Sequence, residues 1–150
     1  MSTTIIASDI VFNKTERQVI AAIAEATITE DASRNLPAAS DPQVLAIILK
    51  KAAHLETRLK AGIELLQSEI DPLAASPLAL LKKLGEDGRL RSFSRMITIV
   101  ILQSYYQDPR VLEALKLAAR PPFPLGHEVE AGDWSLLEPV KKRGSFYRPA

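Results

Sequence analysis

Cysteine is absent from the 150-residue sequence, which excludes disulfide bonds, thiolate catalysis and cysteine-ligated zinc or iron–sulfur sites. An excess of charge of one sign is absent as well, because 19 basic and 18 acidic side chains leave a formal net charge of +1. The most apolar run, ITIVIL at residues 97–102, is far shorter than the roughly 20 residues that a membrane-spanning helix needs. We therefore expect no nucleic-acid partner and no membrane span.

Targeting and nucleotide-binding motifs are also missing. The stretch MSTTIIASDIVFNKTERQ has neither a basic segment before an apolar one nor a twin arginine, the two features of export signals. As written, the sequence predicts a cytoplasmic protein, or a periplasmic one if it is exported with a partner. No glycine-rich phosphate loop is present, since LGEDG at residues 84–88 is typical of the end of a helix.

Candidate catalytic or metal-binding residues are few. His54 lies in KKAAHLETRLK, where the neighbouring cations disfavour a metal ion, so we expect it at the surface. His127 precedes Glu128 and Glu130, but one histidine without a rigid element beneath it is a poor metal site. Asp108 in YQDPRV has the position of a helix N-cap. We expect no catalytic, cofactor or metal site in this chain; an enzyme that uses His127 is the remote alternative.

Helix start signals recur along the chain, whereas strand signals are few. A capping box and three pairs of an N-cap residue followed by proline each indicate the beginning of a helix. The apolar segment RLRSFSRMITIVILQSYYQ has no second strand-like run to pair with, so we expect a central helix rather than a buried strand. We predict an all-α bundle of about five helices, stabilised mainly by packing of apolar faces. The start signals are Asn13 with Glu16, Asp41-Pro42, Ser76-Pro77 and Asp108-Pro109.

The same patterns predict where the helices bend, face the core and end. No helix-breaking residue interrupts the segment that follows Asp41-Pro42, so we expect either one long helix or two helices with a bend near Gly62. The third helix is expected to place Leu78, Leu81 and Leu84 on one side. The helix that begins at Asp108-Pro109 is expected to end near Ala119.

The composition changes after Ala119. Residues 120–150 hold five of the ten prolines and four of the eight aromatic residues. Because large aromatic side chains usually become buried, we expect this arm to be ordered by packing against a protein surface. Two possibilities stay open: the arm closes the chain's own bundle, or it docks on another protein through stiffened backbone and aromatic anchors. We interpret residues 1–150 as a single domain, with a helical body at about 13–119 and an extended C-terminal arm at about 120–150.

Three stretches carry a family resemblance. They are FNKTERQVIAAIAEATI near the start, LQSYYQDPRV, and RPPFPLGHEVEAGDWSLLEPVKKRGSFYR in the arm. In this order they resemble the opening helix, the aromatic-then-Asp-Pro signature and a subgroup's C-terminal tail in the gluconate 2-dehydrogenase subunit 3 family. Members are the small (gamma) subunits of large FAD-dependent sugar and alcohol dehydrogenases of the glucose–methanol–choline class. The resemblance covers essentially the whole chain.

The resemblance implies a role without catalysis in this chain. It suggests a small subunit that binds, stabilises and helps mature a large FAD-dependent sugar, alcohol or glycoside oxidoreductase subunit, with the FAD held by that partner. A free-standing helical adaptor with no oxidoreductase partner is the alternative. The expected partner-binding residues are Tyr105, Tyr106, Asp108, Pro109, Pro121, Pro122, Phe123, Trp134, Phe146, Tyr147 and Arg148.

Overall fold

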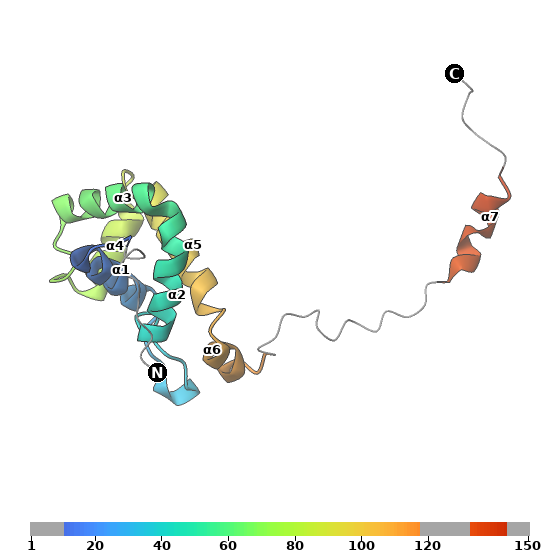
Figure 1. The fold of residues 1–150 in the computed structure, drawn as a ribbon, viewed down its shortest axis with the longest axis horizontal. Helices are drawn as coiled ribbons and strands as arrows, with labels where there is room; N and C mark the ends of the chain where they lie inside the picture. The colour runs from blue at the N-terminus through green and yellow to red at the C-terminus, as the bar shows by residue number, and fades with distance from the viewer. Residues whose placement is uncertain (1–10, 118–132, 144–150) are drawn as a thin grey trace, which may run out of the picture. The chain divides into compact units, whose positions relative to one another are not determined.

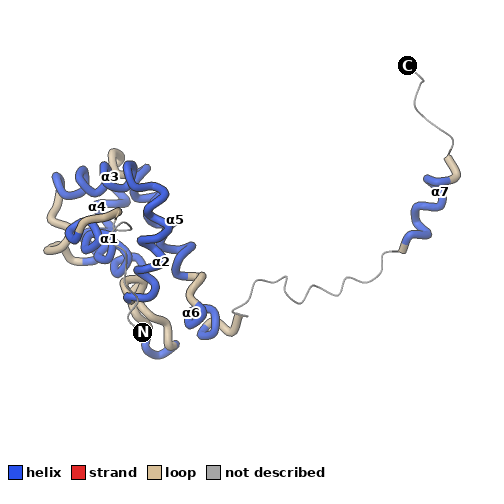
Figure 2. The backbone as a smooth tube through the Cα atoms, viewed as in Figure 1, coloured by secondary structure: helices blue, strands red, loops and turns tan. Residues whose placement is uncertain are grey.

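The computed structural model of the protein describes residues 11–117 and 133–143. The chain divides into two units, Met1–Ala119 and Arg120–Ala150. Within the described residues every regular element is helical (Figure 1; Figure 2), so the predicted all-α fold is confirmed. The first unit contains α1 (Lys14–Thr27), α2 (Pro42–Ala52), α3 (Glu56–Glu69), α4 (Pro77–Glu86), α5 (Arg91–Tyr105) and α6 (Pro109–Ala114), with short 3-10 turns at Ala32–Arg34 and Ala53–Leu55. The second contains a 3-10 turn at Trp134–Leu137 and α7 (Glu138–Lys141).

The predicted helix starts are confirmed. At α1 the Asn13 side chain accepts a hydrogen bond from the Glu16 backbone N–H at 2.8 Å, and the Glu16 carboxylate accepts one from the Asn13 N–H at 2.7 Å. Asp41, Ser76 and Asp108 cap α2, α4 and α6 with a side chain that accepts from a backbone N–H, and each is followed by a proline. Every cap pairs a backbone donor that the first turn of a helix leaves free.

Helix α5 is central to the first unit, because α1, α2, α3 and α4 all contact it, and α1 likewise contacts α2, α3 and α4. Its inner face is buried, and Ile97 and Ile101 have no exposed surface. The buried Ser104 hydroxyl donates to the Val100 carbonyl at 2.7 Å, so this polar group has a partner inside the core. The prediction of a central helix is confirmed. The largest fully buried side chains are Ile20, Ile23, Ile48, Leu59, Ile63, Leu66, Leu80, Leu90, Ile97 and Ile101.

The bend predicted near Gly62 is wrong. The break between α2 and α3 lies at the 3-10 turn Ala53–Leu55. Gly62 lies inside α3 and is buried, and a Cβ added there would be 2.1 Å from Cδ2 of Phe93 in α5. The missing side chain therefore allows α3 and α5 to pack closely. Neither glycine nor proline marks the actual break, so the sequence held no local signal for it.

The face expected of α4 is also corrected. Leu80 and Leu84 are buried, whereas Leu78 is 78% exposed and Leu81 is 40% exposed. Helix α4 contacts α1 and α5. Packing against these two helices therefore selects Leu80 with Leu84, four residues apart, as the inward pair.

The last helix of the first unit is shorter than expected, because α6 ends at Ala114 and not near residue 119. Lys116 has a left-handed backbone with φ 59°, and the Leu117 N–H donates to the Leu112 carbonyl at 2.8 Å. This is the hydrogen-bond pattern of a Schellman C-cap, which usually has glycine at the left-handed position. Because Lys116 and not glycine occupies the left-handed position, the sequence did not indicate where α6 ends.

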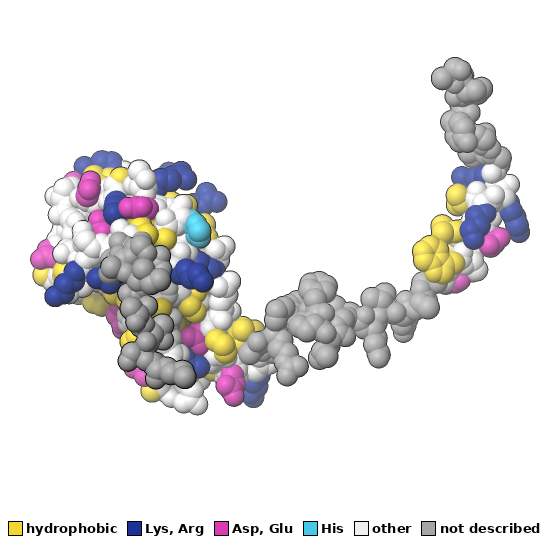
Figure 3. All heavy atoms as spheres, viewed as in Figure 1, with side chains coloured by type: hydrophobic (Ala, Val, Ile, Leu, Met, Phe, Trp, Pro, Cys, Tyr) yellow, Lys and Arg dark blue, Asp and Glu magenta, His cyan; other side chains and the backbone are white. Residues whose placement is uncertain are grey.

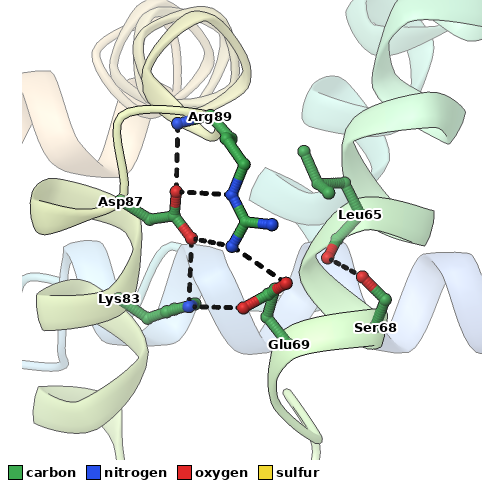
Figure 4. A network of polar contacts seen from close by, with 6 residues as sticks. All are labelled: Leu65, Ser68, Glu69, Lys83, Asp87 and Arg89. Carbon is green, nitrogen blue, oxygen red and sulfur yellow. Dashed lines mark hydrogen bonds and ion pairs between the residues drawn. The ribbon is translucent and has the colours of Figure 1, made fainter.

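An ion network ties the end of α3 to the connection between α4 and α5 (Figure 4). Glu69 pairs with Lys83 Nζ and Arg89 Nη2, both at 2.9 Å, and Asp87 pairs with the same cations at 3.0 and 2.9 Å. Side-chain hydrogen bonds from Lys83 and Arg89 lower the pKa of the Glu69 carboxyl, and those from Arg89 and Lys83 lower that of Asp87. The network thus holds the turn that precedes the central helix.

Gly62→Ala is expected to lower the free energy of unfolding by about 1–3 kcal/mol, because the new methyl group must displace the Phe93 ring or separate α3 from α5. Gly85→Ala in α4 is the matched control. No atom lies within 4 Å of its Cβ position, so the helix propensity of alanine should raise stability by about 0.5–1 kcal/mol. Urea unfolding followed by circular dichroism measures both changes. A Gly62→Ala protein as stable as the wild type would contradict the close helix contact.

Candidate partner-binding surfaces

The two tyrosines of the SYYQDPR segment point in different directions. Tyr105 is 3% exposed, and its hydroxyl donates to the Pro37 carbonyl at 2.9 Å. Burial raises the pKa of this phenol. Tyr106 is 52% exposed, and its ring meets that of Tyr105 edge-on with centroids 5.5 Å apart. One ring therefore anchors the end of α5 in the core, while the other is available at the surface.

Asp108 is buried and has two local partners. Its carboxylate accepts from the Arg110 backbone N–H at 2.8 Å, and it pairs with the Arg110 guanidinium at 2.8 Å. The same guanidinium pairs with Asp41, the N-cap of α2, at 2.7 Å. Hydrogen bonds from Arg110 lower the pKa of both carboxyls. Arg110 therefore connects the beginnings of α2 and α6, and Asp108 is held as a charged cap, which confirms its predicted N-cap position.

The structure separates the predicted partner-binding residues into three groups. Tyr106, Pro109 and Trp134 are exposed. Tyr105 and Asp108 are buried, and the contacts just described are all within the first unit. The remaining six lie outside the described residues: Pro121, Pro122, Phe123, Phe146, Tyr147 and Arg148.

The outer face of α5 carries an apolar stripe that sequence reasoning missed. Ile99 is 43% exposed and Leu102 is 38% exposed, and Tyr106 follows on the same side just beyond the end of the helix. Partly buried Met96 lies one turn before Ile99. These residues recur at helical spacing within RMITIVILQSYY. This spacing within an otherwise apolar segment was the available sequence signal for an outward stripe.

The described segment of the second unit is amphipathic and exposed. Asp133 caps the turn, since its carboxylate accepts from the Ser135 N–H at 3.0 Å. Four large apolar side chains follow within seven residues, and apolar surface is visible on this segment in Figure 3. Their exposed fractions are 71% for Trp134, 74% for Leu136, 41% for Leu137 and 57% for Val140. Apolar side chains concentrated in this way indicate a contact surface.

His54, in the 3-10 turn between α2 and α3, is exposed, which confirms the expected surface position. His127 lies outside the described residues. In the described ranges, no three His, Asp or Glu side chains gather as a metal site would require.

Asp108→Ala is expected to lower the free energy of unfolding by about 2–4 kcal/mol, because it removes the cap of α6 and one carboxylate of a partly buried ion pair. Asp108→Asn retains the cap and loses only the charge, so it should cost less. Chemical denaturation at neutral pH measures both.

The pH dependence of stability in the wild type and in Asp108→Asn separates the contribution of the Asp108 charge from that of packing. Because the folded pKa of Asp108 is lowered, its charge stabilises the fold above the unfolded value of about 3.9, and this contribution is lost as the pH falls through the folded pKa. The stability difference between wild type and Asp108→Asn should therefore shrink as the pH is lowered from neutral to about pH 2. A difference that stays constant over this range would argue against the ion pair.

No helix in the described parts of the chain has the length and apolar character to cross a membrane. Comparison with protein-family models, with curated proteins and with solved structures gives no match to this chain. The case for a function therefore depends on the surfaces described above and on the resemblance of the sequence.

Proposed function

We propose that the chain is a non-catalytic small subunit that binds and stabilises a large FAD-dependent dehydrogenase subunit. The observation that carries the binding role is the exposed apolar cluster of the second unit, led by Trp134. The class of partner comes from the sequence resemblance, through LQSYYQDPRV and the residues that follow it. Flavin and redox chemistry belong to the partner in this proposal.

The distribution of buried residues supports a binding role for the second unit. Among the residues that the structure describes, the buried apolar ones run from Phe12 to Val111, all in the first unit. Trp134 and Leu136, by contrast, expose more than two thirds of their surface. An exposed tryptophan close to several aliphatic side chains is the composition of an interface anchor, since aromatic residues dominate binding energy at protein contacts.

The first unit supplies a rigid support in this proposal. Tyr105 and Asp108 hold the end of α5 and the beginning of α6, and they leave Tyr106 exposed between them. An ordered support lowers the entropy lost on association, so the exposed stripe of α5 can contribute contact area at small cost. The electrostatics agree with this role, because the Asp108 carboxylate is paired and unsuited to proton transfer near neutral pH.

Co-expression tests the maturation role. A large FAD-dependent dehydrogenase subunit should give a higher soluble yield when it is co-expressed with this chain than when it is expressed alone, because covering apolar surface lowers aggregation. The isolated chain should show no flavin absorbance. Equal partner yield with and without the chain would count against the proposal, and stoichiometric FAD in the isolated chain would contradict the assignment of flavin to the partner.

Trp134→Ala tests the binding surface. Loss of a central aromatic anchor should weaken the complex by about 2 kcal/mol or more, while the melting temperature of the isolated chain stays unchanged because Trp134 is exposed. Leu78→Ala in α4, which removes another highly exposed apolar side chain, is the matched control and should leave binding unchanged. Calorimetry with the purified flavoprotein and thermal unfolding give the two readouts.

Truncation after Ala119 adds a second readout for the same surface. The shortened chain retains every buried apolar residue of the described core, so it should stay folded and helical but no longer co-purify with the partner. Full-strength binding by the truncated chain would contradict docking through the arm, and aggregation of that chain would indicate that the arm closes its own bundle.

A further inference from the structure

A groove of about 700 Å³ lies on the first unit, between the beginning of α3 and one side of α5, from Arg91 to Gln103. Its floor is apolar and includes Leu55, Met96 and Val100. Arginine side chains border it, and no carboxylate belongs to its lining. The rim arginines are Arg58, Arg89, Arg91 and Arg95.

Three of the rim arginines have no ion-pair partner in the described part of the chain. Arg89 is engaged, because Asp87 and Glu69 pair with it. Arg58, Arg91 and Arg95 form no such pair within residues 11–117 and 133–143, and all three are exposed. The groove therefore combines an apolar floor with positive charge that residues 11–117 leave unbalanced.

The position of one of these cations is unfavourable for the isolated fold. Arg91 is the first residue of α5, and this helix has neither a side-chain N-cap nor an acidic residue in its first turn. The helix dipole disfavours a cation at this position, where acidic residues are normally preferred. A local conflict of this kind with helix stability is typical of a functional surface.

We propose that this groove binds an acidic amphipathic segment of a partner protein. Arginine guanidinium groups bind carboxylates in bidentate pairs, and the apolar floor accepts the aliphatic side chains between them. The arginines are complementary in charge to an acidic segment, and the lining favours this occupant over a single-stranded nucleic acid because it holds no aromatic ring on which a base would stack. Ile99 belongs both to the groove and to the exposed stripe of α5, so the groove continues that surface. The proposal rests on the proposed function in that both require a protein partner.

The test uses the full chain and a fluorescein-labelled peptide built from repeated Glu-Leu-Leu-Glu blocks, with a Lys-Leu-Leu-Lys peptide as its counterpart. Fluorescence anisotropy should show saturable binding of the acidic peptide alone, weakened when salt is raised from about 50 mM to about 500 mM. Arg95→Glu and Arg58→Glu should each weaken binding by about tenfold or more, because like charges then face the peptide. Lys14→Glu is the matched control, with the same charge change at the exposed first residue of α1, and should change affinity less than about twofold.

Several outcomes would overturn the groove's assignment. They are no saturable binding of the acidic peptide, equal binding of both peptides, or unchanged affinity in the Arg58→Glu and Arg95→Glu proteins. Arginine-dependent sedimentation with phosphatidylserine vesicles, without peptide binding, would assign the groove to a membrane surface. A native mass that falls from dimer to monomer in Arg95→Glu would assign it to a second copy of the chain.

The two proposals fail separately. If the flavoprotein co-purifies with the wild-type chain but the acidic peptide does not bind, the groove's assignment fails and the proposed function stands. If the peptide binds with the expected arginine dependence but the flavoprotein neither co-purifies nor gains yield, the groove's assignment stands and the proposed function fails. Circular dichroism of each arginine variant tests that it is folded, which is expected because Arg58 and Arg95 are both exposed.

Discussion

The fold of the first unit depends on the burial of one face of α5. Four helices contact this one element, and Ile97 and Ile101 lose all their exposed surface in those contacts. Helix α3 approaches α5 closely only because Gly62 has no side chain to meet the Phe93 ring. A helix buried on one side by several neighbours must still present its other side outward. The exposed stripe and the arginine-lined groove both follow from this constraint.

Ion pairs fix the two ends of α5 without contributing to its apolar core. Before the helix, Glu69 and Asp87 share Lys83 and Arg89, and they hold the turn that leads into it. After it, Arg110 joins the caps of α2 and α6. Exposed ion pairs of this kind contribute modestly to stability, but they fix geometry. The exposed stripe of α5 and the arginine-lined groove therefore lie on a well-positioned element.

The SYYQDPR segment combines structural and surface roles in consecutive residues. Tyr105 and Asp108 complete the core and the helix cap, whereas Tyr106 is exposed. A substitution in this segment can therefore reduce association either through loss of a contact or through displacement of α6. Measurements of stability and of binding on the same variants are needed to separate these effects, since the two roles lie only one residue apart.

Local chemistry allowed much of the fold to be predicted from the sequence. The caps at Asn13, Asp41, Ser76 and Asp108 form between residues two or three apart, so their patterns indicated the helix starts directly. The apolar character of residues 96–102 likewise predicted a central helix. The composition change after Ala119 falls where the chain divides into two units.

Contacts between distant residues decided the rest. Packing against α1 and α5 selected Leu80 over Leu78, and the approach of Phe93 explains Gly62 as a point of close contact rather than a bend. The groove is the clearest case, because Arg58 and Arg95 are separated by a helix and a turn in sequence and become neighbours only when α3 packs on α5. Helical periodicity records which residues share a face, but the neighbour that each face meets is set by packing of the whole unit.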